Sequence, residues 1–288
     1  MPIPLARPDI TESEIQAVLE VLKTPNLSLG PRLPEFEEKI ARYIGRKHAI
    51  AVNSGTSGLF LCLKALGIGP GDEVITTPFT FIASANCIIM TGAKPVFVDI
   101  EPTNLNIDPQ KIESAITGKT KAILPVEVFG NPAGFDEIAR IACEKSLPLV
   151  EDSCEALGSA LNGKKAGTFG AMSCFAFYPN KQITTGEGGM ILTDDQEHAD
   201  ICRSLRNQGR SKTGGWLGHE RLGYNFRLSD INCALGIAQL ARIEQIKQKR
   251  AKVAEYYQKI LADDDRVILP HVSAAVDMSL FVFVIRPT

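Results

Sequence analysis

One lysine stands in a setting that could support covalent chemistry. Lys181 follows a Pro-Asn turn and precedes residues 182–189, which include three glycines and two threonines. A lysine that lies among apolar groups can attack a carbonyl carbon as a nucleophile. A lysine in a loop is more often a solvated surface charge, so Lys181 on its own leaves both interpretations open.

Acidic residues follow an apolar segment earlier in the chain. Residues 147–150 are Leu-Pro-Leu-Val, and Glu151, Asp152 and Glu155 lie just beyond them. Carboxylates at the end of a buried strand cost free energy unless they are paired. One of them could cap the next helix, or it could keep a buried heterocyclic nitrogen protonated.

Small and aromatic residues follow two further apolar segments. Residues 53–58 are Asn-Ser-Gly-Thr-Ser-Gly. At the start of a helix, the free N–H groups from Gly55 onward and the hydroxyls of Thr56 and Ser57 suit a phosphate, although an ordinary helix cap has the same composition. The stretch is neither a P-loop nor a dinucleotide fingerprint. Phe79 or Phe81 could offer a ring face to a planar ligand, but an isolated phenylalanine is more often a core residue.

The order of these features narrows their interpretation. A phosphate-binding turn, an aromatic ring, a strand-end aspartate and then a lysine together describe a pyridoxal 5′-phosphate site. In such a site Lys181 forms a Schiff base with the cofactor, and Asp152 partners the pyridinium nitrogen. No residue is assigned to a metal.

Alternating strand and helix patterns must position these residues. Such alternation implies βαβ units and a mainly parallel sheet, with ligands beyond the carboxyl ends of the strands. The predicted strands are 49–52, 73–76, 95–99, 122–128, 147–151, 173–177, 188–193 (of undetermined direction) and 280–285. The predicted helices are 33–44, 58–66, 82–90, 109–115, 135–144 and a long helical region over about 229–261, after a first helix that starts at a capping box, Thr11 to Glu14.

The bulk composition is that of a globular protein with an ordinary core. The chain has 288 residues, of which 44% are hydrophobic and 22% charged, and its formal net charge of -2 gives no electrostatic basis for binding nucleic acid or an anionic membrane. The first residues lack the apolar core of a signal peptide, and no apolar run approaches the ~18 residues of a membrane span. Seven single cysteines without a C-x-x-C pair indicate buried thiols in a reducing compartment, so a cytoplasmic location is expected.

With these residues in view, the chain resembles the DegT/DnrJ/EryC1/StrS group of pyridoxal-phosphate-dependent sugar aminotransferases, which are fold-type I enzymes. The motifs are 3–10, Gly30-Pro31, 53–56, 151–156, Lys181 with 184–189, and 223–227. The resemblance implies an α/β fold, with a large domain whose mainly parallel central sheet is flanked by helices. The expected domains are 1–228, the N-terminal arm and cofactor-binding domain, and 229–288, a long linking helix and the beginning of a small carboxyl-terminal domain.

The resemblance also implies the role of each site residue. Lys181 matches the lysine that binds the cofactor covalently and moves the substrate proton, and Asp152 matches the partner of the pyridinium nitrogen. Gly55, Thr56 and Ser57 match the turn that binds the cofactor phosphate.

Four more residues complete the expected site. Phe81 matches an aromatic residue that stacks on the pyridine ring, and Glu155 lies where many relatives carry Gln or His against that ring. Asn225 matches an asparagine that reaches the phosphate from the neighbouring subunit, which implies a homodimer with shared active sites. Tyr178 is predicted to contact the substrate.

The function implied is amino-group transfer, with L-glutamate as the expected donor and a nucleotide-linked keto-sugar as the acceptor. Such a reaction serves amino-sugar biosynthesis for cell-surface polysaccharide or secondary metabolites. Dehydratases of the group replace the lysine with histidine, so Lys181 argues against that alternative. A cofactor-binding regulator, or a catalytically impaired paralogue, is the other alternative.

Two features depart from the family pattern. Relatives often have serine five residues before the lysine, in contact with the phosphate, whereas this chain has Ala176. Relatives also continue well beyond residue 288, so a chain truncated at its carboxyl end is expected.

Overall fold

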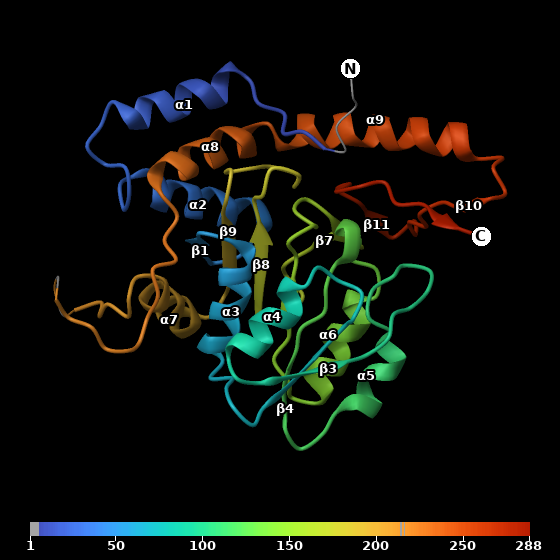
Figure 1. Ribbon diagram of the computed structural model, residues 1–288, viewed down its shortest axis with the longest axis horizontal. Coiled ribbons are helices and arrows are strands. Elements are labelled where there is room, and N and C mark those ends of the chain that lie inside the picture. The colour runs from blue at the N-terminus through green and yellow to red at the C-terminus, as the bar shows by residue number, and fades with distance from the viewer. Residues whose placement is uncertain (1–5, 214, 216) are drawn as a thin grey trace.

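The computed structural model describes residues 6–213, 215 and 217–288. A twisted central sheet lies between two layers of helices (Figure 1). This arrangement confirms the α/β fold that the alternating pattern predicts.

The central sheet is mainly parallel. β2 pairs in parallel with β3 and β4, β5 pairs in parallel with β8, and isolated parallel bridges connect the β4 region to the β5 region. β9 runs antiparallel to its neighbours β8 and β1, which gives the strand of undetermined direction its place. The strands of this sheet are β1 (His48–Val52), β2 (Glu73–Thr76), β3 (Lys94–Phe97), β4 (Thr120–Ile123), β5 (Val150–Asp152), β8 (Met172–Ala176) and β9 (Gly189–Thr193).

The helices cover both faces of the sheet. Most of the predicted helices form within a few residues of their expected bounds, and the predicted region 229–261 consists of two helices that meet at Arg242. The helices are α1 (Glu12–Leu22), α2 (Arg32–Ile44), α3 (Gly55–Ala65), α4 (Ala83–Met90), α5 (Pro109–Ala115), α6 (Phe135–Glu144), α7 (Gln196–Arg206), α8 (Asp230–Ala241) and α9 (Ile243–Leu261), with a short 3₁₀ turn at Val128–Gly130.

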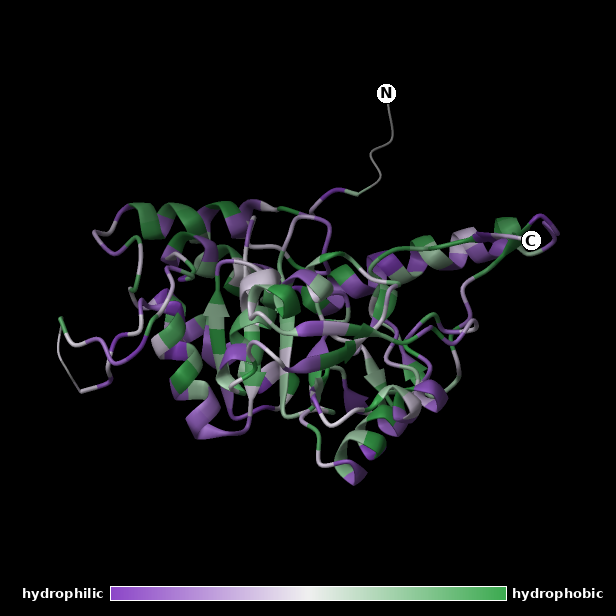
Figure 2. Cartoon of the chain, turned by 60° about the horizontal axis from the view of Figure 1, so that its bottom comes forward, coloured by the Kyte–Doolittle hydropathy of each residue, from purple (hydrophilic) through white to green (hydrophobic). Residues whose placement is uncertain are grey.

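Side chains of each strand alternate between two cores because successive residues point to opposite faces. In β1, Ile50 and Val52 pack with α3, α4 and α7, whereas Ala49 and Ala51 pack with α2, α8 and α9. A third cluster extends the second face, where α5 and α6 pack on β2 and β4. Figure 2 shows the hydrophobic colour concentrated in the central strands, while the outer helices alternate between the two colours.

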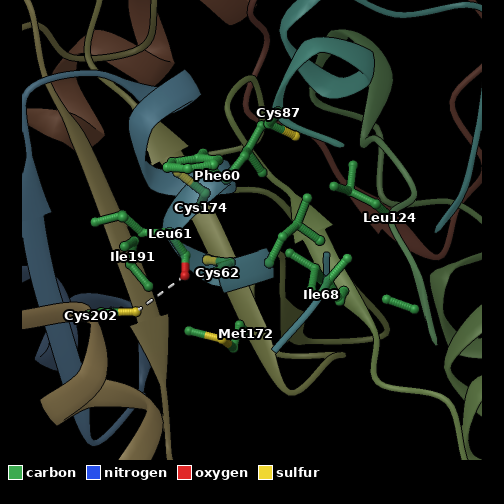
Figure 3. Packing of buried hydrophobic residues seen from close by; sticks show 14 of the residues in the cluster. Phe60, Leu61, Cys62, Ile68, Cys87, Leu124, Met172, Cys174, Ile191 and Cys202 are labelled. Carbon is green, nitrogen blue, oxygen red and sulfur yellow. Dashed lines mark hydrogen bonds between the residues drawn. The ribbon is translucent and has the colours of Figure 1, made fainter. Parts of the chain in front are cut away.

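Several cysteines belong to the first of these cores. Cys62, Cys87, Cys174 and Cys202 are fully buried among apolar side chains, with Phe60 and Leu61 between them (Figure 3). Cys202 Sγ lies 3.8 Å from the carbonyl oxygen of Leu61. Five of the seven free cysteines are buried as predicted, whereas Cys154 is intermediate and Cys143 is exposed.

The prediction of a last strand over 280–285 is wrong, because these residues form no strand. The carboxyl-terminal region forms only short pairings, β6 (Ala160–Leu161) with β7 (Lys164–Lys165) and β11 (Val276–Asp277), and β10 (Val267–Ile268) with β12 (Arg286–Pro287). Within the run, Arg250 donates a hydrogen bond to the carbonyl oxygen of Phe281, and just before it Gln182 donates to that of Ser279. Of the helices described, none is long and apolar enough to cross a membrane.

Candidate active site

A cavity of about 760 Å³ lies at the carboxyl edge of the sheet, next to the first turn of α3. Strands β5 and β8 end at its wall, as the rule for ligand sites in open parallel sheets requires. Most of the predicted site residues line it, namely Gly55, Thr56, Phe81, Asp152, Glu155, Tyr178 and Lys181.

Lys181 lies in the connection between β8 and β9. Its side chain is 14% exposed, and its Nζ is 3.2 Å from Glu155 Oε1 and 4.2 Å from the centre of the Phe281 ring. The loop is fixed by main-chain hydrogen bonds, in which Thr185 donates to Phe177 and Phe177 donates to Gly188. The ammonium group is therefore largely sheltered from solvent, with a carboxylate and an aromatic face as its neighbours.

Asp152 is the last residue of β5 and is 5% exposed. Its Oδ2 accepts a hydrogen bond of 2.6 Å from Ser84, and its Oδ1 accepts one of 3.3 Å from the main-chain N–H of Cys154. Because each carboxylate oxygen has two lone pairs, these bonds leave one lone pair on each oxygen for a donor from the cavity.

Other buried acids lie behind Asp152. Glu151 points away from the cavity, and its carboxylate accepts main-chain hydrogen bonds of 2.9 Å from Gly167 and 2.6 Å from Gly170. Burial raises the pKa of Glu151 to about 7, although those N–H groups and Arg46, 3.7 Å away, favour its charged form.

Glu127 is also completely buried, on the chain segment that pairs with Asp152. Its main-chain N–H donates to the carbonyl oxygen of Asp152 at 3.1 Å. Burial, followed by the charge of Glu151, raises the pKa of Glu127 well above its ordinary value, which favours the neutral acid.

The first turn of α3 provides the predicted phosphate-binding turn. Ser54 is its N-cap, and its hydroxyl accepts the N–H of Ser57 at 3.1 Å. A Cβ atom at Gly55 would lie 2.8 Å from both Ala176 Cβ and Cys154 Sγ, so a larger residue would not fit there. Ser57 is buried, and its hydroxyl accepts a hydrogen bond of 3.0 Å from Ser54, which places it behind the cavity wall formed by Gly55 and Thr56.

Aromatic residues surround the cavity mouth. Phe81 lines the cavity and is 75% exposed, which leaves a ring face free for a ligand. Phe79 contacts Phe129 edge to face at 5.9 Å. Phe129 has a positive φ of 57°, which is rare for a bulky residue, and its N–H donates to Glu155 Oε2 at 2.9 Å.

Asn225 lies away from the cavity in this chain. It is exposed and pairs with Asn207 in an isolated antiparallel bridge, while Phe226, next to it, accepts the N–H of Asn53 at 2.9 Å. The segment that carries Asn225 thus runs beside the strand that leads into the phosphate-binding turn, without sending this side chain into the cavity.

Sequence reasoning missed several residues of the site. Ser84, Phe129, Asn180 and Phe281 touch Asp152 or line the cavity. Phe129 directly follows the predicted strand 122–128, and a position just beyond a strand end could have marked it as a site residue. Phe281 lies in the run predicted to be a strand, and nothing in the local sequence marks Ser84.

The residues present fit pyridoxal phosphate. The cavity brings together a sheltered lysine, a buried aspartate and a helix N-terminus with small residues, on separate elements of one sheet edge. Ala176 also lines the cavity, which agrees with its expected place beside the cofactor phosphate.

Comparison with known proteins gives a consistent result. The model of the DegT/DnrJ/EryC1/StrS aminotransferase family matches residues 8–288. The chain is 43% identical to the spore coat polysaccharide biosynthesis protein SpsC of Bacillus subtilis over 94% of this chain and 72% of that protein. It is also 43% identical to GDP-perosamine synthase of Caulobacter vibrioides, over 94% and 73%. The PLP form of Spr1654 from Streptococcus pneumoniae superposes with a TM-score of 0.94 at 31% identity, covering 100% of this chain and 78% of that one.

The fold and the solved structure define a fold-type I pyridoxal-phosphate enzyme. Within that class, the chain belongs to the DegT/DnrJ/EryC1/StrS aminotransferase family and is a sugar aminotransferase.

Proposed function

We propose that this enzyme transfers the amino group of L-glutamate to a nucleotide-linked keto-sugar. The observation that carries the proposal is the meeting of Lys181, Asp152 and the first turn of α3 around one cavity. GDP-perosamine synthase, a relative at 43% identity, carries a nucleotide-linked sugar in its name, which supports the acceptor class.

In this proposal pyridoxal phosphate, when bound, supplies an electron sink for a carbanion formed at the donor's α-carbon. Lys181 would hold the cofactor covalently through Nζ, and the same Nζ would accept the proton from that α-carbon. Asp152 would keep the ring nitrogen protonated, and the N–H groups and hydroxyl of Gly55 and Thr56 would bind the phosphate.

Side chains around Nζ would prepare it for these roles. Glu155 and Phe281 contact Lys181 from two sides, so they limit the positions that its Nζ can occupy. Phe81 would cover one ring face, and Tyr178, 51% exposed at the cavity wall, would contact the substrate.

A second copy of the chain would complete the site. The exposure of Asn225 on the surface agrees with a role in a neighbouring cavity. Large apolar side chains are also exposed near the cavity mouth and along α4, among them Phe81, Ile82, Ile89 and Met90. Such a group of exposed apolar residues is typical of a surface that a partner covers.

The proposal also covers the organisation and the location of the chain. Residues 1–228 would form the arm and cofactor domain, and 229–288 the linking helices and the beginning of a small domain. Ser229 accepts the N–H of Asn232 as the N-cap of α8, so the proposed boundary coincides with the start of an element. The enzyme would act in the cytoplasm.

The test uses the cofactor-loaded protein. Addition of L-glutamate should release 2-oxoglutarate in an amount that matches the protein, and nucleotide-linked 3-keto or 4-keto sugars should then restore turnover. Lys181→Ala should lose both the yellow absorbance of the bound cofactor and the release of 2-oxoglutarate. Lys212→Ala, which changes an exposed lysine, should retain both. A protein that binds the cofactor but releases no 2-oxoglutarate would be a regulator, and the proposal would fail.

A further inference from the structure

Asp152 accepts a hydrogen bond from a residue of α4 to which the family resemblance assigns no role in the site. Ser84, in the first turn of α4, is fully buried and lies 2.6 Å from Asp152 Oδ2. Thr80 Oγ1 lies 2.8 Å from Ser84 Oγ, and Thr80 itself lines the cavity. The three side chains form a continuous row from the cavity wall to the carboxylate.

The donors in this row have a fixed direction. A carboxylate only accepts hydrogen bonds, so Ser84 must donate its single proton to Asp152. Ser84 Oγ then has only lone pairs left for Thr80, and Thr80 must donate to it. A hydrogen bond to a charged group is shorter and stronger than one between neutral groups, which agrees with the 2.6 Å separation.

We propose that Ser84 is a positioning residue for the cofactor ring, acting through Asp152. This inference rests on the proposed function, because it requires Asp152 to be the partner of the ring nitrogen. Ser84 fixes the direction of the carboxylate and stabilises its negative charge, so that the free lone pairs of Asp152 meet the ring N–H without prior rearrangement.

The arrangement couples two walls of the site. Phe81 and Ser84 are three residues apart, at the start of α4, and the carbonyl oxygen of Phe81 accepts the main-chain N–H of Ser84 at 3.2 Å. The same turn therefore carries the aromatic ring at the cavity mouth and the donor to the buried carboxylate. A change in the position of this turn would move the ring face and the partner of the ring nitrogen together.

The surroundings of Asp152 explain why such a donor matters. Two completely buried acids lie close by in the structure, Glu151 in the same strand as Asp152 and Glu127 on the segment that pairs with it. Among the residues described, no lysine or arginine makes an ion pair with Asp152. Ser84 and the N–H of Cys154 are the donors that the described structure gives this carboxylate. Loss of the Ser84 hydroxyl leaves Oδ2 without that partner inside the protein.

The test measures binding to the apoprotein of pyridoxal phosphate and of 1-deazapyridoxal phosphate, in which a C–H group replaces the ring nitrogen. Ser84→Ala should weaken binding of pyridoxal phosphate on the order of tenfold. Binding of the deaza analogue should differ between Ser84→Ala and wild type by no more than roughly twofold. Ser84→Thr, which keeps the hydroxyl, should bind both compounds as wild type does.

Two further variants separate the possible outcomes. In an Asp152→Asn background, Ser84→Ala should add no further loss, because its partner carboxylate is gone. Ser173→Ala, which removes another fully buried serine hydroxyl bonded to a carbonyl oxygen, should not change the ratio of the two affinities.

Equal losses for both cofactor compounds in Ser84→Ala would overturn the inference and indicate general damage to the fold, which thermal unfolding would show. If Asp152→Asn binds pyridoxal phosphate as well as wild type, the assignment of Asp152 fails instead.

Discussion

Ala176 lies in the cavity wall beside Gly55 and Cys154, where the family pattern often has a serine. We predict that Ala176→Ser tightens binding of pyridoxal phosphate roughly three- to tenfold, because the added hydroxyl can donate to the phosphate. Titration of the apoprotein with the cofactor measures this. Binding of pyridoxal, which lacks the phosphate, should not change, and a gain for pyridoxal as well would contradict the reason given.

Individual site residues differ in how far the sequence alone could predict them. Lys181 and Asp152 could be assigned because each follows an apolar strand, and strand ends meet at one edge of a parallel sheet. Ser84 could not, because a serine within a helix has no local feature that tells which distant carboxylate it meets. Its contact with Asp152 joins residues 68 positions apart, and only the packing of α4 against the sheet creates it.

At the scale of elements, α3 depends on its N-cap for the shape of the phosphate-binding turn. We predict that Ser54→Ala lowers the free energy of unfolding by about 1 kcal/mol, because the N–H of Ser57 loses its acceptor. The same change should weaken binding of pyridoxal phosphate, since the first turn of α3 lines the cavity. Chemical denaturation and cofactor titration give the two values.

A second helix cap provides the matched control. Asp195 is the N-cap of α7 and accepts the N–H of His198 at 2.9 Å, on a helix that does not line the cavity. Asp195→Ala should cost a similar free energy of unfolding and leave cofactor affinity unchanged. If both variants lost cofactor affinity equally, the loss would reflect stability alone.

The elements that sequence predicted well are those whose pattern is local. Helices α5 and α6 have their predicted bounds, and the extended segments before the site residues form strands. Sequence could not give the direction of β9, because pairing with β1 and β8 depends on contacts between distant segments. The run 280–285 has the composition of a strand but borders the cavity, where the side chain of Arg250 donates to the main-chain oxygen of Phe281, and Gln182 donates to that of Ser279 just before the run.

At the scale of the whole molecule, the proposed shared site predicts complementation between two inactive variants. Lys181→Ala should be inactive, and Asn225→Asp should bind the cofactor poorly because a carboxylate beside a phosphate is repelled. A mixed dimer would contain one intact site, with Lys181 from one chain and Asn225 from the other. Mixing the variants should therefore restore up to about half of the wild-type activity for each mixed dimer.

Subunit exchange must be shown independently in that experiment, for example with two differently labelled chains. Exchange without recovered activity would mean that Asn225 acts within its own chain or has no role. Gln208→Ala, which changes a neighbouring polar residue with a side chain bonded to Arg227, provides a comparison for damage to the same segment.

The buried acids predict how the stability of the whole fold depends on pH. Glu151 has a pKa of about 7 in the folded protein and 4.5 as an ordinary glutamate, so between these values the folded chain retains a proton that the unfolded chain loses. The stabilisation is complete below the lower value and is lost as pH rises through the upper one. Glu127, whose pKa is also raised, adds to this loss.

We therefore predict that Glu127→Gln is more stable than wild type at about pH 8 and nearly equal to it at about pH 5, because the amide cannot ionise inside the protein. Denaturant unfolding across this range measures the difference. Glu113→Gln, at an exposed glutamate paired with Lys145, should leave the shape of the pH profile unchanged. A constant offset between Glu127→Gln and wild type at all pH values would contradict the raised pKa of Glu127.

The cysteines differ in exposure, so their rates of reaction with a thiol reagent can report local opening of the fold. Cys143 is exposed and should react with a thiol reagent at once, whereas burial raises the pKa of Cys202 to about 12, and the cysteines around it are equally enclosed. Their labelling requires the core behind the cavity to open, so the rate of labelling measures how often it does. Cys154, in the cavity wall, has an intermediate position and should label slowly in the apoprotein and more slowly still with pyridoxal phosphate bound. Mass spectrometry that resolves the labelling of each cysteine would then measure cofactor occupancy at Cys154 and opening of the core at the buried cysteines in one experiment.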